Sequence, residues 1–312
     1  MATLLSDSDH LDEHGDRVLL GSRARGPRVV IPGFEILSRI GKGGMSQVYR
    51  ARHEATGRQV ALKTVRPDIA EEIGRMDVVE RLLAEGGLLT GLSHPYLMPI
   101  YGLGDAGERL YISMQYAPAG DLDARIQDGM SVMQTLKITH CMADALDFAH
   151  KHGLVHRDVK PGNILFLENG TPLLSDFGLA KPFELDLQLT ATGMVLGSPH
   201  YMSPEQAMGT SVDGRTDIYS LGALLFTMLT GNPPYHACKT YWEALRMHVE
   251  GPVPELPHPH GWLQPLITRS MAKNPDRRIA TAGAMASGLA KAALALHRAQ
   301  KRQAKKRLER GS

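Results

Sequence analysis

The sequence predicts an α+β fold of two lobes, in which a small antiparallel sheet with one helix precedes a larger, mainly helical part. Two observations lead to this fold class. Between residues 34 and 116, short segments rich in β-branched and aromatic residues alternate with glycine-containing turns. After Gly120, apolar residues instead recur at helical spacing. A chain of 312 residues is long enough to give each lobe its own core.

The first lobe is expected to hold five strands and one helix. The strands are predicted over residues 34–40, 47–52, 59–65, 96–104 and 109–116. The helix is predicted over residues 77–92 and ends before His94-Pro95. The glycine cluster at 41–44 and Thr56-Gly57 separate the first three strands.

The second lobe is expected to consist mainly of helices. They are predicted over residues 134–150, 218–229, 241–249, 263–272 and 281–299, and the apolar composition of 218–229 indicates a buried helix. The expected boundaries are a disordered tail over 1–33, the first lobe over 34–116, the second over 117–298 and a basic tail over 299–312. A docking role for the first tail and membrane contact by the second are the less favoured alternatives.

The composition is that of an ordinary soluble globular protein, with 43% hydrophobic and 22% charged residues. A formal net charge of +2 gives no global field for binding nucleic acid. Cys141 and Cys238 lie far apart without metal-ligand spacing, which is typical of a reducing compartment. No apolar run approaches the ~20 residues of a membrane span, and the N-terminus lacks the apolar core of a signal peptide. We therefore expect a cytoplasmic protein without nucleic-acid partners.

One short segment has the residues needed for phosphoryl transfer. Residues 156–163 are His-Arg-Asp-Val-Lys-Pro-Gly-Asn, and Asp176-Phe177-Gly178 follows. Asp158 suits the task of orienting an acceptor hydroxyl and taking its proton, while Lys160 can reach the transferred phosphate as a point charge. Asn163 and Asp176 offer the oxygen ligands that Mg²⁺ prefers. An Asp or Asn alone on a loop usually caps a turn, but the whole set in this order favours catalysis.

A glycine-rich segment in the first lobe predicts the nucleotide site. Residues 40–48 are Ile-Gly-Lys-Gly-Gly-Met-Ser-Gln-Val and lie between two predicted strands, unlike the strand-to-helix setting of a dinucleotide site. Backbone N–H groups in such a loop approach phosphates closely because Cβ atoms are missing. Lys63 closes the next apolar strand, where a lysine usually extends towards solvent. In this context we predict that Lys63 contacts the α- and β-phosphates of ATP.

Together these motifs resemble the protein-kinase signature set over roughly residues 34–295. The chain is most similar to bacterial Hanks-type Ser/Thr protein kinases, through its Gly-Gly-Met run and the Tyr-Met-Ser-Pro-Glu-Gln motif at residues 201–206. The activation segment also resembles that of kinases associated with type VI secretion. The resemblance implies a bilobal protein-kinase-like fold and transfer of the γ-phosphoryl group of ATP to Ser or Thr of proteins, in bacterial signalling. It implies Mg²⁺ as the metal, with Mn²⁺ as an alternative.

The resemblance also implies which residues form the active site. Catalysis is implied for Lys63, Glu85, Asp158, Lys160 and Asn163. Glu85, on the helix predicted over residues 77–92 and called helix C in this family, would pair with Lys63. Cofactor binding is implied for Ile40, Gly41, Lys42, Gly43, Gly44, Met45, Ser46, Val48, Ala61, Lys63, Gln115, Ala117, Asp121, Leu165 and Asp176, and metal binding for Asn163 and Asp176.

Within this set the resemblance implies an adenine pocket. Val48, Ala61 and Leu165 would enclose the adenine ring. Residues 115–117 would form the hinge that hydrogen-bonds adenine, next to Met114 as gatekeeper. Asp121 would lie near the ribose.

Three supporting contacts are implied as well. Ser198 would bridge Asp158 and Lys160. Glu205 would pair with Arg278 and so tie the activation segment to the second lobe. Asp217 would hold the backbone of the catalytic loop. Ordinary core or surface positions are the alternative for each.

Lys160 and the long segment 176–205 favour Ser or Thr of proteins as acceptors, rather than tyrosine or small metabolites. Arg157 can pair with a phosphorylated activation segment and order it. Thr190 and Thr192 are the predicted autophosphorylation sites, with plain loop hydroxyls as the alternative. A homodimer that autophosphorylates in trans is left open.

Two departures from the family pattern lie in the glycine loop and in helix C. Ser46 occupies the third glycine position, which the fold tolerates at negative φ. Gly86-Gly87 follows Glu85, and each interior glycine costs a helix about 1 kcal/mol relative to alanine. Helix C then either docks conditionally or packs closely against a neighbour.

A pseudokinase scaffold and a small-molecule phosphotransferase are the competing functions, and the intact catalytic set argues against the scaffold.

Overall fold

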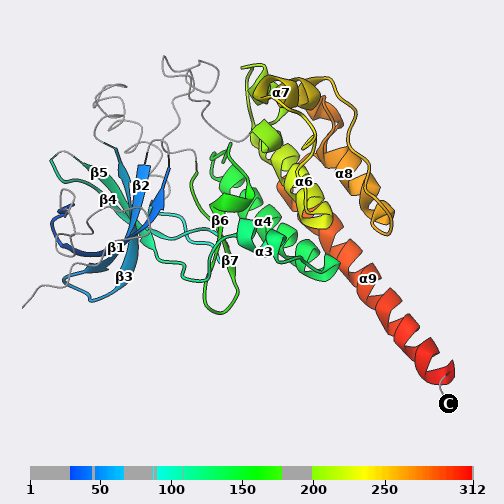
Figure 1. The fold of residues 1–312 in the computed structure, drawn as a ribbon, viewed down its shortest axis with the longest axis horizontal. Helices are drawn as coiled ribbons and strands as arrows, with labels where there is room; N and C mark the ends of the chain where they lie inside the picture. The colour runs from blue at the N-terminus through cyan, green and yellow to red at the C-terminus, as the bar shows by residue number, and fades with distance from the viewer. Residues whose placement is uncertain are drawn as a thin grey trace, which may run out of the picture.

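The computed structural model describes residues 29–43, 46–66, 87, 90–107, 109–177 and 199–310. They form a sheet lobe and a larger helical lobe side by side (Figure 1), which confirms the predicted bilobal α+β class. Most of the helix predicted over residues 77–92 lies outside the described residues. So do seven individually predicted positions, which are Gly44, Met45, Glu85, Gly86, Thr190, Thr192 and Ser198.

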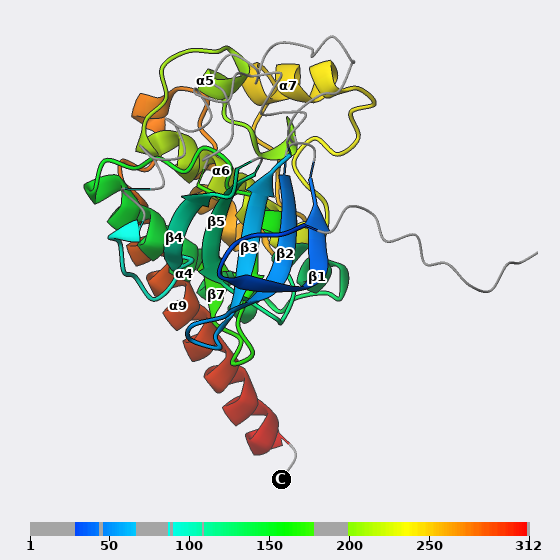
Figure 2. The ribbon, with the colours of Figure 1, turned by 90° about the vertical axis from the view of Figure 1, so that its left-hand side faces the viewer.

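The first lobe is a five-stranded antiparallel sheet with strand order β1-β2-β3-β5-β4. The strands are β1 Phe34–Lys42, β2 Ser46–His53, β3 Gln59–Val65, β4 Ile100–Asp105 and β5 Leu110–Gln115. Figure 2 shows them across one face, with the helices of the second lobe behind. Strand β4 begins at Ile100 rather than residue 96, because the backbone of 96–98 instead pairs with Leu174 of the second lobe.

The sheet lobe also includes residues that the sequence assigned to a disordered tail. Ile31 is 1% exposed and packs in a small core with Tyr49, Val60 and Leu62. Gly33, at φ 82°, makes the tight turn that lets Ile31 pair with Phe34. The ordered lobe therefore begins before residue 34, and residues 29–33 belong to it.

The second lobe is built around helices α4 and α6. Its helices are α3 Leu122–Gln127, α4 Val132–Lys151, α5 Pro204–Ala207, α6 Gly214–Thr230, α7 Tyr241–Val249, α8 Gln264–Ser270 and α9 Ala282–Arg310. Every side chain of α6 from Thr216 to Met228 is buried, which confirms the predicted core helix. Short 3₁₀ turns are Pro161–Asn163, Pro199–Tyr201, Gly261–Leu263 and Pro275–Arg277, and the hairpin is β6 Ile164–Phe166 with β7 Pro172–Leu174.

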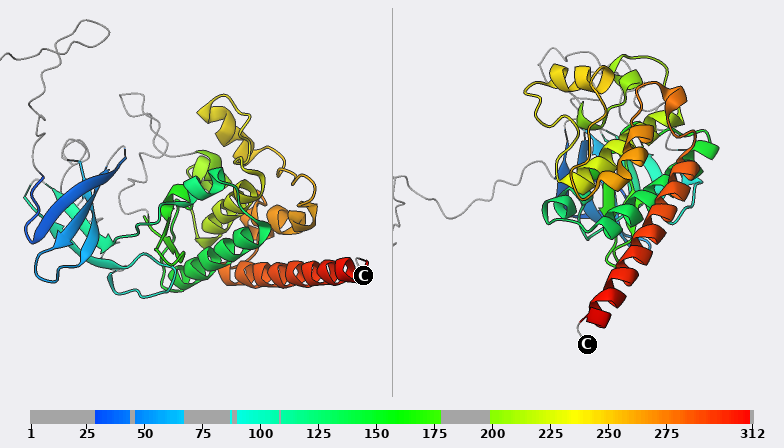
Figure 3. Two further views of the ribbon diagram at one scale, coloured as in Figure 1. Left: turned by 60° about the horizontal axis from the view of Figure 1, so that its bottom comes forward. Right: turned by 90° about the vertical axis from the view of Figure 1, so that its right-hand side faces the viewer.

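Helix α9 continues to Arg310, through residues that were predicted to be a basic tail. Its second half is rich in Ala, Lys, Arg and Gln, which are all strong helix formers. The first half packs along α4 through Ala282, Met285 and Leu289, while the second half projects from the lobe (Figure 3). Among the described helices, α9 alone meets the length and hydropathy criteria for a membrane span. In the structure 28% of its apolar window is buried, and the buried side chains of the helix pack on α4.

Candidate active site

The backbone of the catalytic loop, residues 156–163, is held by a carboxylate from α6. Asp217 lies in the first turn of α6 and its side chain is fully buried. It accepts hydrogen bonds from the backbone N–H groups of His156 at 2.8 Å and Arg157 at 2.7 Å. His150, at the end of α4, contributes Nε2 at 2.7 Å to the same carboxylate. The predicted role of Asp217 is therefore confirmed, and His150 is an additional member of this network.

His156 connects the catalytic loop to the segment that carries Asp176. Its ring is fully buried, and burial lowers its pKa, so the imidazole is neutral. Nε2 lies 2.8 Å from the carbonyl of Ser175, and Nδ1 lies 3.2 Å from the backbone N of Asp158. A neutral ring satisfies both contacts when Nε2 carries the proton and Nδ1 accepts from Asp158.

Three predicted catalytic residues meet at one carboxylate. Oδ2 of Asp158 lies 2.8 Å from Lys160 Nζ and 2.9 Å from Asn163 Nδ2. The same amide also donates to the backbone carbonyl of Asp158 at 2.7 Å. Pro161 starts the 3₁₀ turn that folds Asn163 back over Asp158. This arrangement holds the side chain of Asp158 from two sides and places a cation beside it.

A second ion pair joins the two lobes. Lys63 Nζ on β3 lies 2.7 Å from Oδ1 of Asp176, which follows β7. Asp176 at φ 61° and Arg157 at φ 64° both adopt the left-handed conformation, which costs a non-glycine residue about 1–2 kcal/mol. Such strain persists only where surrounding contacts determine it, and it is concentrated at functional sites. The predicted pair of Lys63 with Glu85 stays a prediction.

The residues predicted to enclose adenine lie in one apolar cluster. Ala61 and Met114 are buried in it and are paired across β3 and β5. Val48, Ala117 and Leu165 pack against the same cluster from β2, the chain after β5, and β6. The structure therefore brings together five apolar residues from both lobes, as an adenine site requires.

The glycine loop is closed by the hydrogen bond from Gly43 N to Ser46 O, at 2.8 Å. Ser46 is not among the described non-glycine residues with positive φ, so its φ is negative, as the fold requires if it is to tolerate a serine in place of the third glycine. Gly41 lies opposite Val48 in the β1–β2 ladder, flanked by the exposed Ile40 and Lys42. The structure thus describes both ends of the glycine loop, and the predicted approach of its backbone N–H groups to phosphates stays a prediction.

Two of the predicted nucleotide contacts have structural roles as well. The backbone N–H of Gln115 donates to Pro99 O at 2.9 Å, which joins the hinge to the chain before β4. Asp121 caps α3 by accepting from Ala124 N at 3.0 Å, and its backbone bridges Leu165. Helix α3 was absent from the prediction, since six residues are too few for a clear periodic pattern.

The donor set fits a divalent cation bound through a nucleotide. Both amide contacts of Asn163 Nδ2 go to Asp158, which leaves the amide oxygen of Asn163 to face a cation. Asp176 adds a carboxylate, and hard oxygen ligands of this kind suit Mg²⁺ or Mn²⁺. In the described part of the chain, no three His, Cys, Asp or Glu side chains group as a metal cage. The phosphates of ATP would supply the remaining ligands, as is usual for Mg²⁺.

The predicted pair of Glu205 and Arg278 is present and buried. Arg278 Nη1 and Nη2 lie 2.6 and 2.7 Å from the two carboxylate oxygens of Glu205. The remaining guanidinium N–H groups donate to three backbone carbonyls, those of Ala272, Arg215 and Lys273. Burial alone raises the pKa of Glu205, but hydrogen bonds from Arg278 and Thr216 outweigh burial and lower it. The pair fixes α5, the helix at the end of the activation segment.

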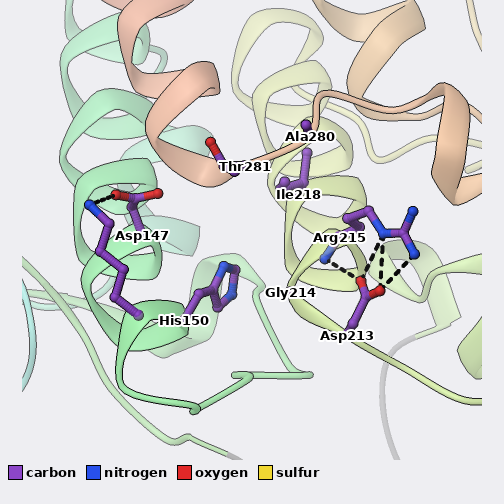
Figure 4. Close-up of a pocket in the computed structure, with 9 residues that line it drawn as sticks. Asp147, His150, Asp213, Gly214, Arg215, Ile218, Ala280 and Thr281 are labelled. Carbon is purple, nitrogen blue, oxygen red and sulfur yellow. Dashed lines mark hydrogen bonds and ion pairs between the residues drawn. The ribbon is translucent and has the colours of Figure 1, made fainter.

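A cavity of about 340 Å³ lies between α4, the start of α6 and residues 280–281, which directly precede α9 (Figure 4). His150 lines it. The charged groups around it pair with one another, Asp147 with Lys151 at 2.7 Å and Asp213 with Arg215 at 2.7 Å. The cavity therefore shows no unmatched charge that would select a ligand.

Comparisons with known proteins agree with this geometry. Residues 34–289 match the protein kinase domain model. The chain is 36% identical over 265 residues to the serine/threonine-protein kinase PknB of Mycobacterium leprae, covering 82% of this chain and 42% of that protein. It is 36% identical to PknF of Mycobacterium tuberculosis over 79% of this chain and 53% of that protein. The crystal structure of the Mycobacterium tuberculosis PknI kinase domain superposes with a TM-score of 0.66 at 26% identity, covering 84% of this chain and 97% of that one.

Proposed function

Because the chain belongs to the protein kinase family, we propose that it is a serine/threonine protein kinase that transfers the γ-phosphoryl group of ATP to protein hydroxyls, as in bacterial signalling. The chain spans about half the length of the curated relatives it matches. The observation that carries the proposal is the convergence of Lys160 and Asn163 on Asp158, beside the ion pair of Lys63 and Asp176.

Each of these residues has a defined task. Asp158 orients the acceptor hydroxyl and takes its proton as the oxygen attacks phosphorus. Lys160 stabilises negative charge on the transferred group, and Lys63 holds the α- and β-phosphates. Asn163 and Asp176 hold the metal, which neutralises phosphate charge when bound. Mg²⁺ is the proposed metal, and replacing it by Mn²⁺ in the assay tests the alternative.

A direct experiment is to incubate the purified chain with Mg²⁺, ATP and a generic Ser/Thr protein substrate, beside the Asp158→Asn variant. The proposal expects phosphoserine or phosphothreonine with the wild type and none with the variant. A wild type that binds ATP without transfer would instead support a scaffold. Phosphorylation of purified metabolites in preference to protein would support a small-molecule phosphotransferase.

The activation segment is proposed to regulate this activity. Thr190 and Thr192 are the expected sites, and autophosphorylation in trans through a transient homodimer is the expected route. Mass spectrometry after incubation with Mg²⁺–ATP tests the sites. The rate of modification per molecule should rise with protein concentration, whereas a rate independent of concentration would indicate reaction in cis.

We further propose a cytoplasmic location. Cys141 and Cys238 are free thiols, as expected in a reducing compartment that also supplies ATP. The exposed basic end of α9 is proposed to be solvated rather than bound to a membrane. Fractionation of the native cells tests both statements, since recovery of the protein with the membrane fraction would contradict them.

A further inference from the structure

The peptide bond that precedes Asp158 is held by a side chain from outside the catalytic loop. Gln206 lies on α5, and its Nε2 donates to the backbone carbonyl of Arg157 at 2.8 Å. The N–H on the other side of that peptide bond, of Asp158, donates to His156 Nδ1 at 3.2 Å. A peptide unit is planar and rigid, so these two contacts fix the orientation of the Cα of Asp158.

The conformation fixed in this way is strained. Arg157 has φ 64°, and its own N–H is held by Asp217 at 2.7 Å. A non-glycine residue leaves the left-handed conformation unless contacts on both sides oppose it. Asp217 supplies one of these contacts and Gln206 supplies the other.

Gln206 is presented from a rigid support. The adjacent residue, Glu205, forms the bidentate buried pair with Arg278 that fixes α5. The amide oxygen of Gln206 accepts from Ser203 N at 3.1 Å, while Ser203 Oγ accepts from Gln206 N at 3.3 Å, which is a capping box. Only one orientation of the amide serves both contacts, because the Ser203 N–H needs an acceptor and the Arg157 carbonyl needs a donor.

We propose that Gln206 is a positioning residue that ties the end of the activation segment to the catalytic loop and thereby sets the orientation of Asp158. This inference rests on the proposed kinase function. It connects residues 199–206, at the end of the activation segment, mechanically to the proton acceptor. The capping box and the bridge share one side chain, so the first turn of α5 and the catalytic loop form together.

The test separates the two contacts of the amide. Gln206→Glu keeps a side-chain oxygen that accepts from Ser203 N–H. It replaces the amide nitrogen that donates to the Arg157 carbonyl by a second oxygen, which cannot donate. Ser203→Ala removes the cap oxygen and leaves the bridge intact. Thr210→Val, which loses only a hydrogen bond to Glu205 O on the same segment, is the matched control. All variants are treated with phosphatase first, and steady-state initial rates are measured over a range of ATP concentrations, so that kcat and KM are compared from the same unphosphorylated state.

For Gln206→Glu we expect kcat to fall about 10- to 100-fold, with KM for ATP unchanged within about twofold and a melting temperature near that of the wild type. Ser203→Ala should instead lower the melting temperature by about 3 °C and leave kcat within about twofold. If Gln206→Glu does not fold, Gln206→Met replaces it with the same expected loss of kcat.

A Gln206→Glu or Gln206→Met variant with wild-type kcat would overturn the inference. So would a loss of kcat in Ser203→Ala as large as that in Gln206→Glu, because the cap alone would then explain both. An inactive wild type would instead contradict the proposed function itself, and the two failures are therefore distinguishable.

Discussion

The buried ion pair of Arg278 and Glu205 gives the most quantitative prediction. Arg278→Met keeps similar volume but leaves the carboxylate of Glu205 buried with Thr216 as a remaining partner. Removing one partner of a buried pair costs about 3–5 kcal/mol because the other charge is left uncompensated. The variant also loses its hydrogen bonds to three backbone carbonyls, so the upper end of this range is expected.

The assay is urea unfolding at pH 7.5, followed by circular dichroism, with the free energy of unfolding extrapolated to water. A loss of about 5 kcal/mol is a large share of the ~5–15 kcal/mol typical of a domain. It should lower the melting temperature by about 10 °C. The paired replacement Glu205→Met with Arg278→Met removes both charges and should recover much of the stability.

Two outcomes would refute this reasoning. A loss below about 1 kcal/mol for Arg278→Met would mean that the guanidinium is not needed to compensate Glu205. A double variant that loses the sum of both single losses would mean that the residues act independently.

Three further predictions concern Lys63, Gly222 and His248. Lys63→Met should raise KM for ATP and lower kcat by about 10²-fold or more, measured by steady-state kinetics, because the phosphates lose their cation; unchanged kinetics would contradict the assigned role. Gly222→Ala should cost about 1–3 kcal/mol in urea unfolding, since a Cβ there would lie 2.3 Å from Ser270 Oγ; a stabilised variant would contradict it. The pKa of His248 is lowered by burial to about 3, whereas unfolded histidine titrates near 6.5. The unfolded state therefore binds more protons below about pH 6.5, and this residue should remove about 2 kcal/mol of stability by pH 5. His248→Gln should reduce the fall in stability between pH 7.5 and 5 by that amount, and an identical fall in the variant would contradict it.

Local patterns explain which parts of the fold were predictable from sequence. Strand β3 and helix α7 have the predicted bounds, because turn residues and a capping threonine mark their ends. The end of α9 was not predictable from apolar periodicity, since every side chain after Leu296 whose burial the structure describes is exposed. Strand β4 starts later than predicted because the preceding residues 96–98 pair with Leu174, which lies 76 to 78 positions further along the chain.

The active site also has parts that were predictable from the sequence and contacts that were not. The catalytic loop was predictable because its residues are close in sequence and each type suits one task. The contacts of His150 with Asp217 and of Gln206 with Arg157 join residues 67 and 49 positions apart. Such contacts depend on the tertiary fold. The Ser-x-x-Gln spacing of Ser203 and Gln206 is a capping-box signal in the sequence, but it carries no information about the second contact of the amide.

The central claim is that Asp158 takes the proton of an acceptor hydroxyl at an ATP site formed by other residues. The most direct test measures ATP binding and phosphoryl transfer together for the wild type and Asp158→Asn, with phosphate transfer to protein Ser or Thr as the readout. We expect ATP affinities within about threefold of each other and a transfer rate about 10²- to 10⁴-fold lower in the variant. Transfer by Asp158→Asn at the wild-type rate would contradict it.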